Sequence, residues 1–161
     1  LALVSIMSTT GNPELAQATP EAQTALFTPP PPDRAGYIEA GVEAWRIIGS
    51  PGFPFNEDRV RARVTLAYDR GYCPEGIARQ FVAIIASGNR KPALANIAAP
   101  TLVIHGSADP LVPVAGGYDT AEAIPGAELL VIEGMGHDFP RQAWDRIIEA
   151  LAGLARRAGA L

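Results

Sequence analysis

The sequence predicts an α/β protein with a parallel sheet, and three features of its second half carry that prediction. Residues 101–104 (TLVI) and 129–132 (LLVI) are short aliphatic runs with the composition of buried strands. A helical segment, roughly Gly116 to Ile124, lies between them and ends at the turn Pro125-Gly126. A strand, a helix and a second strand in this order form a βαβ unit, whose two strands run parallel.

Each aliphatic run is followed by a glycine-rich loop that carries a residue suited to acid–base chemistry. Asp109 lies in the loop after the first run, and His137 lies in the loop after the second. About 28 positions separate the two residues, close to the ~30 residues of one βαβ unit. Parallel strands end at the same edge of a sheet, and open α/β sheets place their sites at that edge. We therefore expect both residues at the carboxyl edge.

An aspartate paired with a histidine permits a specific chemistry. A carboxylate that accepts a hydrogen bond from one imidazole nitrogen fixes the tautomer and leaves the other nitrogen free to act as a base. We therefore take Asp109 and His137 as candidate catalytic residues. Taken singly, Asp109 is also typical of a turn former before Pro110, and His137 of a residue at a helix entry. The spacing of the pair favours the catalytic interpretation.

The first half of the chain predicts one strand followed by helices. The apolar run 1–7 is typical of a strand. A short helix begins at Pro20 and is broken by the prolines of residues 29–32. A second helix is expected from about Arg34 to Ile48, because its apolar residues share one face and Gly49 and Pro51 follow it.

Two further helices follow, and the chain ends on another. One begins after Asn56, an N-cap residue, and ends at Gly71; the next starts near Pro74. The last helix is expected over residues 141–157. Five apolar residues of this helix are expected to face the sheet: Trp144, Ile147, Ile148, Leu151 and Leu154.

Three other polar residues have structural interpretations. His105 closes a strand and is expected to be packed or hydrogen-bonded there. Cys73 is expected to be a small buried apolar residue, and Asp138 to cap a helix ahead of Pro140. Two histidines without clustered carboxylates or cysteines argue against a metal site.

The residues around the candidate pair carry a family resemblance. Residues 100–113 (PTLVIHGSADPLVP), 124–127 (IPGA) and 134–138 (GMGHD) resemble the acid strand, helix turn and histidine loop of α/β-hydrolase fold enzymes, in order and spacing. The chain is similar to the esterase-like branch that includes aclacinomycin methylesterases. Residues 5–13 resemble the strand before the cap in that branch.

The resemblance implies an α/β fold that is the C-terminal portion of an α/β-hydrolase parallel sheet with an inserted helical cap. Residues 1–12 would be a core strand and its exit loop, residues 13–90 the helical cap, and residues 91–161 the C-terminal part of the core. The resemblance also implies that Leu111 and Val112, which follow Asp109, face the acyl pocket and bind substrate. It implies no cofactor and no metal.

The family's nucleophile has no counterpart in the sequence. In the family the order is nucleophile, acid, histidine, and the nucleophile sits in a G-x-S-x-G turn, which does not occur here. Ser50 follows Gly49 but the next residues break the pattern, and Ser107 belongs to the acid loop. We therefore expect a fragment cut at the sixth core strand, with its nucleophile upstream of Leu1. Such a chain is expected to be inactive alone.

The expected function is that of part of a hydrolase that acts on a small ester or related carbonyl compound. Alternatives within the fold are a carbon–carbon bond hydrolase, a cofactor-free haloperoxidase, and a dehalogenase or epoxide hydrolase with an aspartate nucleophile. A non-catalytic hydrolase-fold binding protein is the alternative from another class. The residue at the nucleophile position discriminates them: serine favours an esterase, aspartate a dehalogenase or epoxide hydrolase, and glycine or alanine a binding protein.

Composition narrows the classes of partner. The chain has 161 residues, of which 48% are hydrophobic and 19% charged, which suits one globular domain. The formal net charge of −4 argues against a basic surface of the kind that binds nucleic acid. No apolar run reaches the ~18 residues of a membrane span. The expected partners are a small-molecule substrate and either a missing N-terminal half or a second copy. With no targeting signal in view, a cytoplasmic location is expected.

Overall fold

The computed structural model describes residues 1–159 and contains a parallel sheet with helices on both sides. Three strands pair in the order β1 (Leu3–Ile6), β2 (Thr101–Gly106) and β3 (Glu128–Ile132). Both pairings are parallel, with Leu3 opposite Thr101 and Leu102 opposite Glu128. The strands therefore end at a common carboxyl edge, as the βαβ pattern predicts.

The hydrophobic core lies between the sheet and the C-terminal helix. Side chains alternate across a strand, and Leu102 and Ile104 of β2 point to the face covered by α7 (Trp144–Arg157), which follows a single 3-10 turn, η1 (Arg141–Ala143). From α7, Ile147 and Leu154 bury themselves in this core. The core also contains Met7, Ile132, Met135 and Ala143.

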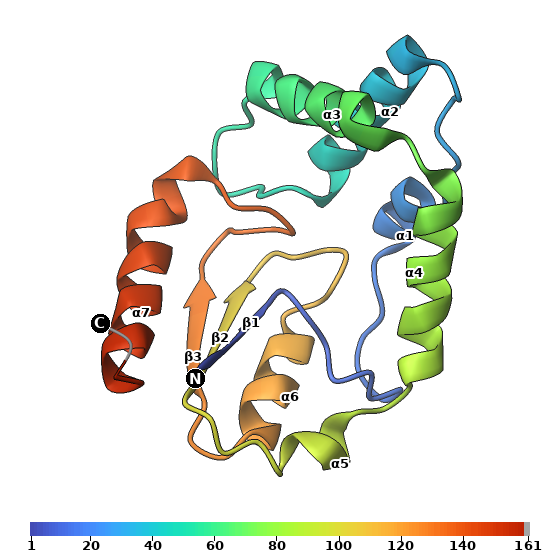
Figure 1. Cartoon of the computed structure of the whole chain (residues 1–161). Coiled ribbons are helices and arrows are strands. Elements are labelled where there is room, and N and C mark those ends of the chain that lie inside the picture. Colours follow the sequence, from blue (N-terminus) through green and yellow to red (C-terminus); the bar gives the residue numbers. More distant parts are fainter. Residues whose placement is uncertain (160–161) are drawn as a thin grey trace.

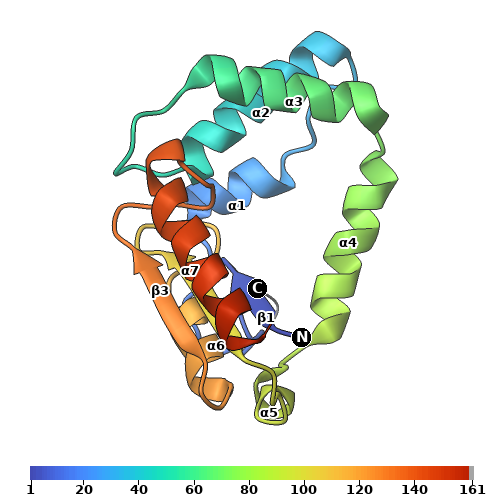
Figure 2. The ribbon, with the colours of Figure 1, turned by 60° about the vertical axis from the view of Figure 1, so that its left-hand side comes forward.

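The opposite face of the sheet is covered by α6 (Ala115–Ala123), as Figures 1 and 2 show. Gly117 of this helix lies against the His105 side chain, and a Cβ on it would come within 2.5 Å of the ring Nδ1. With strands on both sides and helices on both faces, every residue of β2 is buried.

Helices α1 (Pro20–Phe27), α2 (Arg34–Ile48) and α3 (Glu57–Gly71) lie over the carboxyl ends of the strands (Figure 1). Each begins with a side-chain cap that satisfies a free backbone N–H. The capping oxygens belong to Thr19, Asp33 and Asn56. The bounds of α2 and the N-cap of α3 confirm the expectations from the sequence.

Helix α4 (Pro74–Ser87) runs along the side of the molecule towards α5 (Lys91–Leu94), apart from the sheet in both ribbon views. No residue of α4 is buried against the described part of the chain. Its exposed apolar side chains are Ile77, Phe81, Val82, Ile84 and Ile85. Within residues 1–159, the outer edge of β1 also has no partner strand.

A buried carboxylate ties the exit of β1 to α5 and α6. Asp119 on α6 accepts hydrogen bonds from Thr10 Oγ1 at 2.5 Å and from Lys91 Nζ at 2.6 Å. The side chain of Asp119 is almost fully buried, whereas that of Lys91 is partly exposed.

Some expectations about burial were wrong. β3 is only partly buried, because it is the last strand on its side of the described sheet. On α7, Trp144 is 38% exposed and Ile148 is 58% exposed, so they do not face the sheet as expected. Instead, the indole of Trp144 lies under the guanidinium of Arg59, with 4.7 Å between the guanidinium carbon and the ring centroid.

A search of the described residues for a membrane-crossing helix found none with the required length and apolar character.

Candidate active site

Backbone hydrogen bonds join the two glycine-rich loops at the carboxyl edge. Here the acid loop is residues 106–110 and the histidine loop is residues 134–138. Ala108 N donates to Met135 O at 3.0 Å, and Ser107 N donates at 3.0 Å to the O of Ile132, the last residue of β3. The Ser107 hydroxyl accepts a bond from Gly134 N at 2.9 Å. The loops are therefore fixed relative to each other before any contact between their functional side chains is considered.

Two glycines make this close approach possible. A Cβ on Gly106 would lie 2.1 Å from Met135 O, a distance that backbone atoms do not tolerate. Gly134 has a φ of 71°, in the left-handed region that glycine enters without steric cost.

Asp109 is buried, and both of its carboxylate oxygens are engaged. Oδ1 accepts hydrogen bonds from Leu111 N at 2.9 Å and Val112 N at 2.8 Å. Oδ2 lies 2.8 Å from His137 Nδ1. The two backbone bonds fix the rotation of the carboxylate, so Oδ2 is held facing the imidazole.

His137 is the more accessible member of the pair, with 25% of its side chain exposed and none of that of Asp109. Its backbone N–H donates to Ile48 O at 2.8 Å, which connects the histidine loop to the end of α2. Within residues 1–159, Nε2 makes no hydrogen bond to a side chain or to the backbone. A ring held at Nδ1 with Nε2 unengaged is the arrangement in which an imidazole can accept a proton.

His105 lies beneath the acid loop and is fully buried. Its Nε2 is 2.8 Å from Val112 O, and because a carbonyl only accepts, Nε2 carries the hydrogen of that bond. Among the described residues its Nδ1 has no hydrogen-bond partner. The sequence interpretation as a packed, hydrogen-bonded strand-end residue is confirmed, and His105 supports the turn that orients Asp109.

No hydroxyl or thiol of the described residues is hydrogen-bonded to the His137 ring. The Ser50 hydroxyl instead donates to Asp138 Oδ1 and accepts a bond from Gly136 N at 2.9 Å. The expectation that Asp138 caps a helix was therefore wrong. Cys73, expected to be buried, is exposed at the start of α4. Cys73 is exposed because α4, which it precedes, has no residue buried against the described part of the chain.

The contact between Ser50 and Asp138 joins residues 88 positions apart and was not expected from the sequence. The signal that could have pointed to it is the run of small residues on both sides, Gly49, Gly52, Gly134 and Gly136, which allows two backbones to approach closely.

Leu111 and Val112 are partly buried and line a groove of about 530 Å³. The opposite walls are the exit of β1, residues 15–18, and Ile84 of α4. Neither Asp109 nor His137 lines this groove. In residues 1–159, no three histidine, cysteine, aspartate or glutamate side chains gather as a metal site would require.

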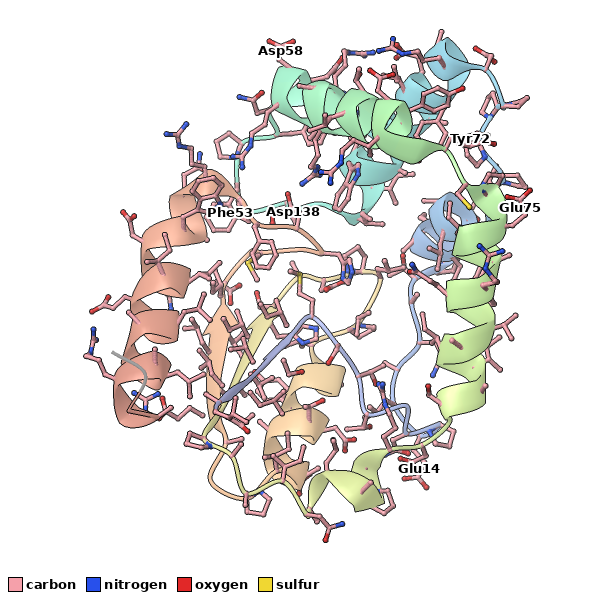
Figure 3. All side chains as sticks on the ribbon, viewed as in Figure 1. Glu14, Phe53, Asp58, Tyr72, Glu75 and Asp138 are labelled. Atoms are coloured by element: carbon pink, nitrogen blue, oxygen red, sulfur yellow. The ribbon has the colours of Figure 1, made fainter. Side chains whose placement is uncertain are left out.

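A second hollow, of about 170 Å³, lies where residues 50–56 meet the histidine loop. Phe53 and Asp138 both line it, and Figure 3 shows their side chains close together. Arg63 is a further lining residue. Burial lowers the pKa of its guanidinium, although the nearby carboxylate of Asp138 acts in the other direction.

Known proteins are similar to this chain in sequence. A family model described as "TAP-like protein" matches residues 83–150. Rhodomycin D methylesterase DnrP from Streptomyces peucetius is 30% identical over 152 residues, which cover 94% of this chain and 50% of that protein. Rhodomycin D methylesterase DauP from Streptomyces sp. (strain C5) is 33% identical over 122 residues, which cover 75% of this chain and 41% of that protein.

The chain has the α/β-hydrolase fold, and its sequence is similar to these methylesterases. Its structure is similar to that of a meta-cleavage product hydrolase from Pseudomonas fluorescens IP01, with a TM-score of 0.71 over 98% of this chain and 56% of that one. At 20% sequence identity this likeness concerns the fold alone. The chain spans about half the length of the curated relatives it matches.

Proposed function

We propose that this chain supplies the acid and the base of a hydrolase that cleaves a small ester or a related carbonyl compound. In this proposal His137 is the general base and Asp109 is the acid that orients it. The observation that carries the proposal is the 2.8 Å contact between Asp109 Oδ2 and His137 Nδ1, made by a carboxylate that two backbone N–H groups hold in place.

The proposed mechanism follows from that contact. The Asp109 carboxylate keeps the proton on Nδ1, so the lone pair of Nε2 is available. Nε2 takes the proton of an attacking hydroxyl and later gives it to the departing alkoxide. While the ring carries that extra proton, the negative charge of Asp109 stabilises the imidazolium. His105, through Val112, keeps the acid loop in the conformation that this requires.

We place the nucleophile outside these 161 residues. Two observations support this: no described hydroxyl or thiol bonds to the His137 ring, and the outer edge of β1 is unpaired in the described sheet. A further segment that pairs with β1 would bring its own strand end to the same carboxyl edge. Such a segment, or a second copy of the chain, is the proposed partner.

The proposed substrate class is a small carboxylic ester. The methylesterase relatives support an ester, and the apolar Leu111 and Val112 on the wall of the larger groove support an apolar acyl group. Helices α1 to α4 would then act as a cap over the site, since α1 to α3 lie above the strand ends.

The test is an ester-hydrolysis assay of the protein that carries this chain, with p-nitrophenyl and methyl esters. Asp109→Asn is expected to lower kcat by about 10⁴, the size of the loss when a triad acid no longer holds the tautomer, and His137→Ala by at least as much. Asp145→Asn, at an exposed aspartate on α7, is the matched control. The 161-residue chain alone is expected to be no faster than free imidazole.

Two results would contradict the proposal. One is turnover by the isolated chain that disappears in His137→Ala, because the nucleophile would then lie within it. The other is a nearly normal rate in Asp109→Asn combined with a lost rate in Asp138→Asn, because the acid would then be Asp138.

A further inference from the structure

We infer that Ser50 is a positioning residue for His137, so that the loop after α2 sets the geometry of the base. This rests on the proposed function of His137. Residues 48–52, which we call the supporting segment, contact the histidine loop, residues 134–138. The two stretches are far apart in the sequence and lie against each other at the carboxyl edge.

The Ser50 hydroxyl bonds to both neighbours of His137. It donates to the Asp138 carboxylate at Oδ1 and accepts from Gly136 N at 2.9 Å. Because these two groups belong to the residues on either side of His137, one side chain holds the backbone before it and the side chain after it. The hydroxyl is partly buried, which shields both bonds from competing water.

Backbone contacts complete the support. His137 N donates to Ile48 O at 2.8 Å, and Gly52 N donates to Gly134 O at 2.9 Å. A Cβ on Gly136 would lie 2.1 Å from Gly49 O, so the backbones are in direct contact. The histidine loop is therefore held from one side by the acid loop and from the other by the supporting segment.

Ser50 also engages the second carboxylate beside the imidazole. Asp138 is adjacent to His137, and its Oδ1 is occupied by the Ser50 hydroxyl. With Asp138 engaged elsewhere, Asp109 is the carboxylate that meets the ring, at 2.8 Å. The titratable groups facing Asp138 include Arg63, whose guanidinium is favoured in its charged form by this carboxylate. Ser50 therefore holds the Asp138 carboxylate in a structural contact, and the Asp109 carboxylate is the one that orients the base.

The experiment compares Ser50→Ala with the unaltered protein that carries this chain, using two measurements. The first is the proton NMR signal of the hydrogen on His137 Nδ1, which reports its bond to Asp109 directly. It is expected to broaden or vanish as the bond opens more often. The second is ester hydrolysis, where kcat is expected to fall between about tenfold and about a hundredfold, the cost of a small misplacement of a catalytic group, with KM nearly unchanged.

Two variants of Asp138 separate the hydrogen bond from the charge. Asp138→Asn keeps an oxygen that can accept from Ser50, so it is expected to retain most of kcat and the Nδ1 signal. Asp138→Ala removes the acceptor and is expected to resemble Ser50→Ala. The double variant is expected to lose no more than either single variant, because both disrupt one interaction. If Ser50→Ala fails to fold, the Asn and Ala variants at Asp138 give the same comparison.

Thr101→Val is the matched control. It removes a buried hydroxyl that donates to Ala99 O at 2.9 Å, at the opposite end of β2 from the site. It is expected to change neither the Nδ1 signal nor kcat. An unchanged Nδ1 signal or an unchanged kcat in Ser50→Ala would overturn the inference, as would a full loss in Asp138→Asn. If the unaltered protein hydrolyses no ester, the proposed function fails, and the Nδ1 signals still decide whether Ser50 positions the ring.

Discussion

Asp109 uses both carboxylate oxygens inside the site, and this accounts for its fixed orientation. Two backbone N–H groups hold Oδ1, and the imidazole of His137 meets Oδ2. A side chain with only the imidazole contact would be free to rotate about its last torsion. His105 adds a further bond to the same turn through Val112 O. At the scale of single residues, the candidate site is therefore a bonded unit rather than two neighbouring polar groups.

Asp119 is the residue for which the structure predicts a pH dependence of stability. Burial raises the pKa of this carboxyl, but hydrogen bonds from Lys91 and Thr10 lower it by more, so it lies below its ordinary value. A lowered carboxyl pKa adds stability above the unfolded pKa, about 3.9, and that stability is lost as pH falls through the folded pKa.

Asp119→Asn is therefore expected to lower the free energy of unfolding at neutral pH, and the difference from the unaltered chain is expected to close below about pH 4. Urea denaturation measured at a series of pH values checks this. Glu14→Gln, which neutralises an exposed carboxylate labelled in Figure 3, is the control and is expected to change stability little. A deficit of constant size across the whole pH range would contradict the assignment.

Among the elements, α4 is the helix whose apolar composition agrees least with its exposed position. It is apolar, begins at Pro74, and leaves Ile84 and Ile85 exposed at 68% and 64%. Large contiguous apolar patches are uncommon on monomers, and an open strand edge such as that of β1 templates association. We expect this helix and this edge to contact a partner.

The 161-residue chain is accordingly expected to self-associate when purified alone, and Ile84→Lys combined with Ile85→Lys is expected to reduce that association. Sedimentation velocity over a concentration series measures it. Leu66→Lys, at an apolar residue of α3 with 57% exposure, is the matched control and is expected to have less effect. A compact monomer with cooperative unfolding would contradict the expectation.

The local signals in the sequence predicted the elements well, because they act over a few residues. The bounds of α2, the Asn56 cap and the start of α1 at Pro20 follow from helix caps and breakers. Burial was predicted less well. A run of four aliphatic residues does not reveal whether its strand is central or last in the sheet, so β3 was expected to be as buried as β2.

The meeting of Asp109 and His137 followed from topology, since parallel strands end at one edge. The contact of Ser50 with Asp138 did not, because it joins the end of α2 to the histidine loop across 88 positions. No local pattern encodes the packing of separate elements, and the same reason explains why Trp144, expected against the sheet, lies under Arg59 instead.

For the whole molecule, the described residues form a sheet with an aspartate–histidine pair at its carboxyl edge and helices above that edge, and the outer edge of β1 has no partner strand. We propose that this assembly activates a nucleophile from outside the chain. The described contacts support it, since no hydroxyl of residues 1–159 bonds to the His137 ring.

Covalent labelling tests that claim most directly. A fluorophosphonate, which reacts with activated serines, is applied to the protein that carries this chain, and the adduct is mapped by peptide mass spectrometry. The account predicts one adduct, on a serine outside residues 1–161, and slower labelling in His137→Ala in parallel with slower ester hydrolysis. An adduct on Ser50, Ser107 or any other serine of this chain, or a labelling rate unchanged in His137→Ala, would contradict it.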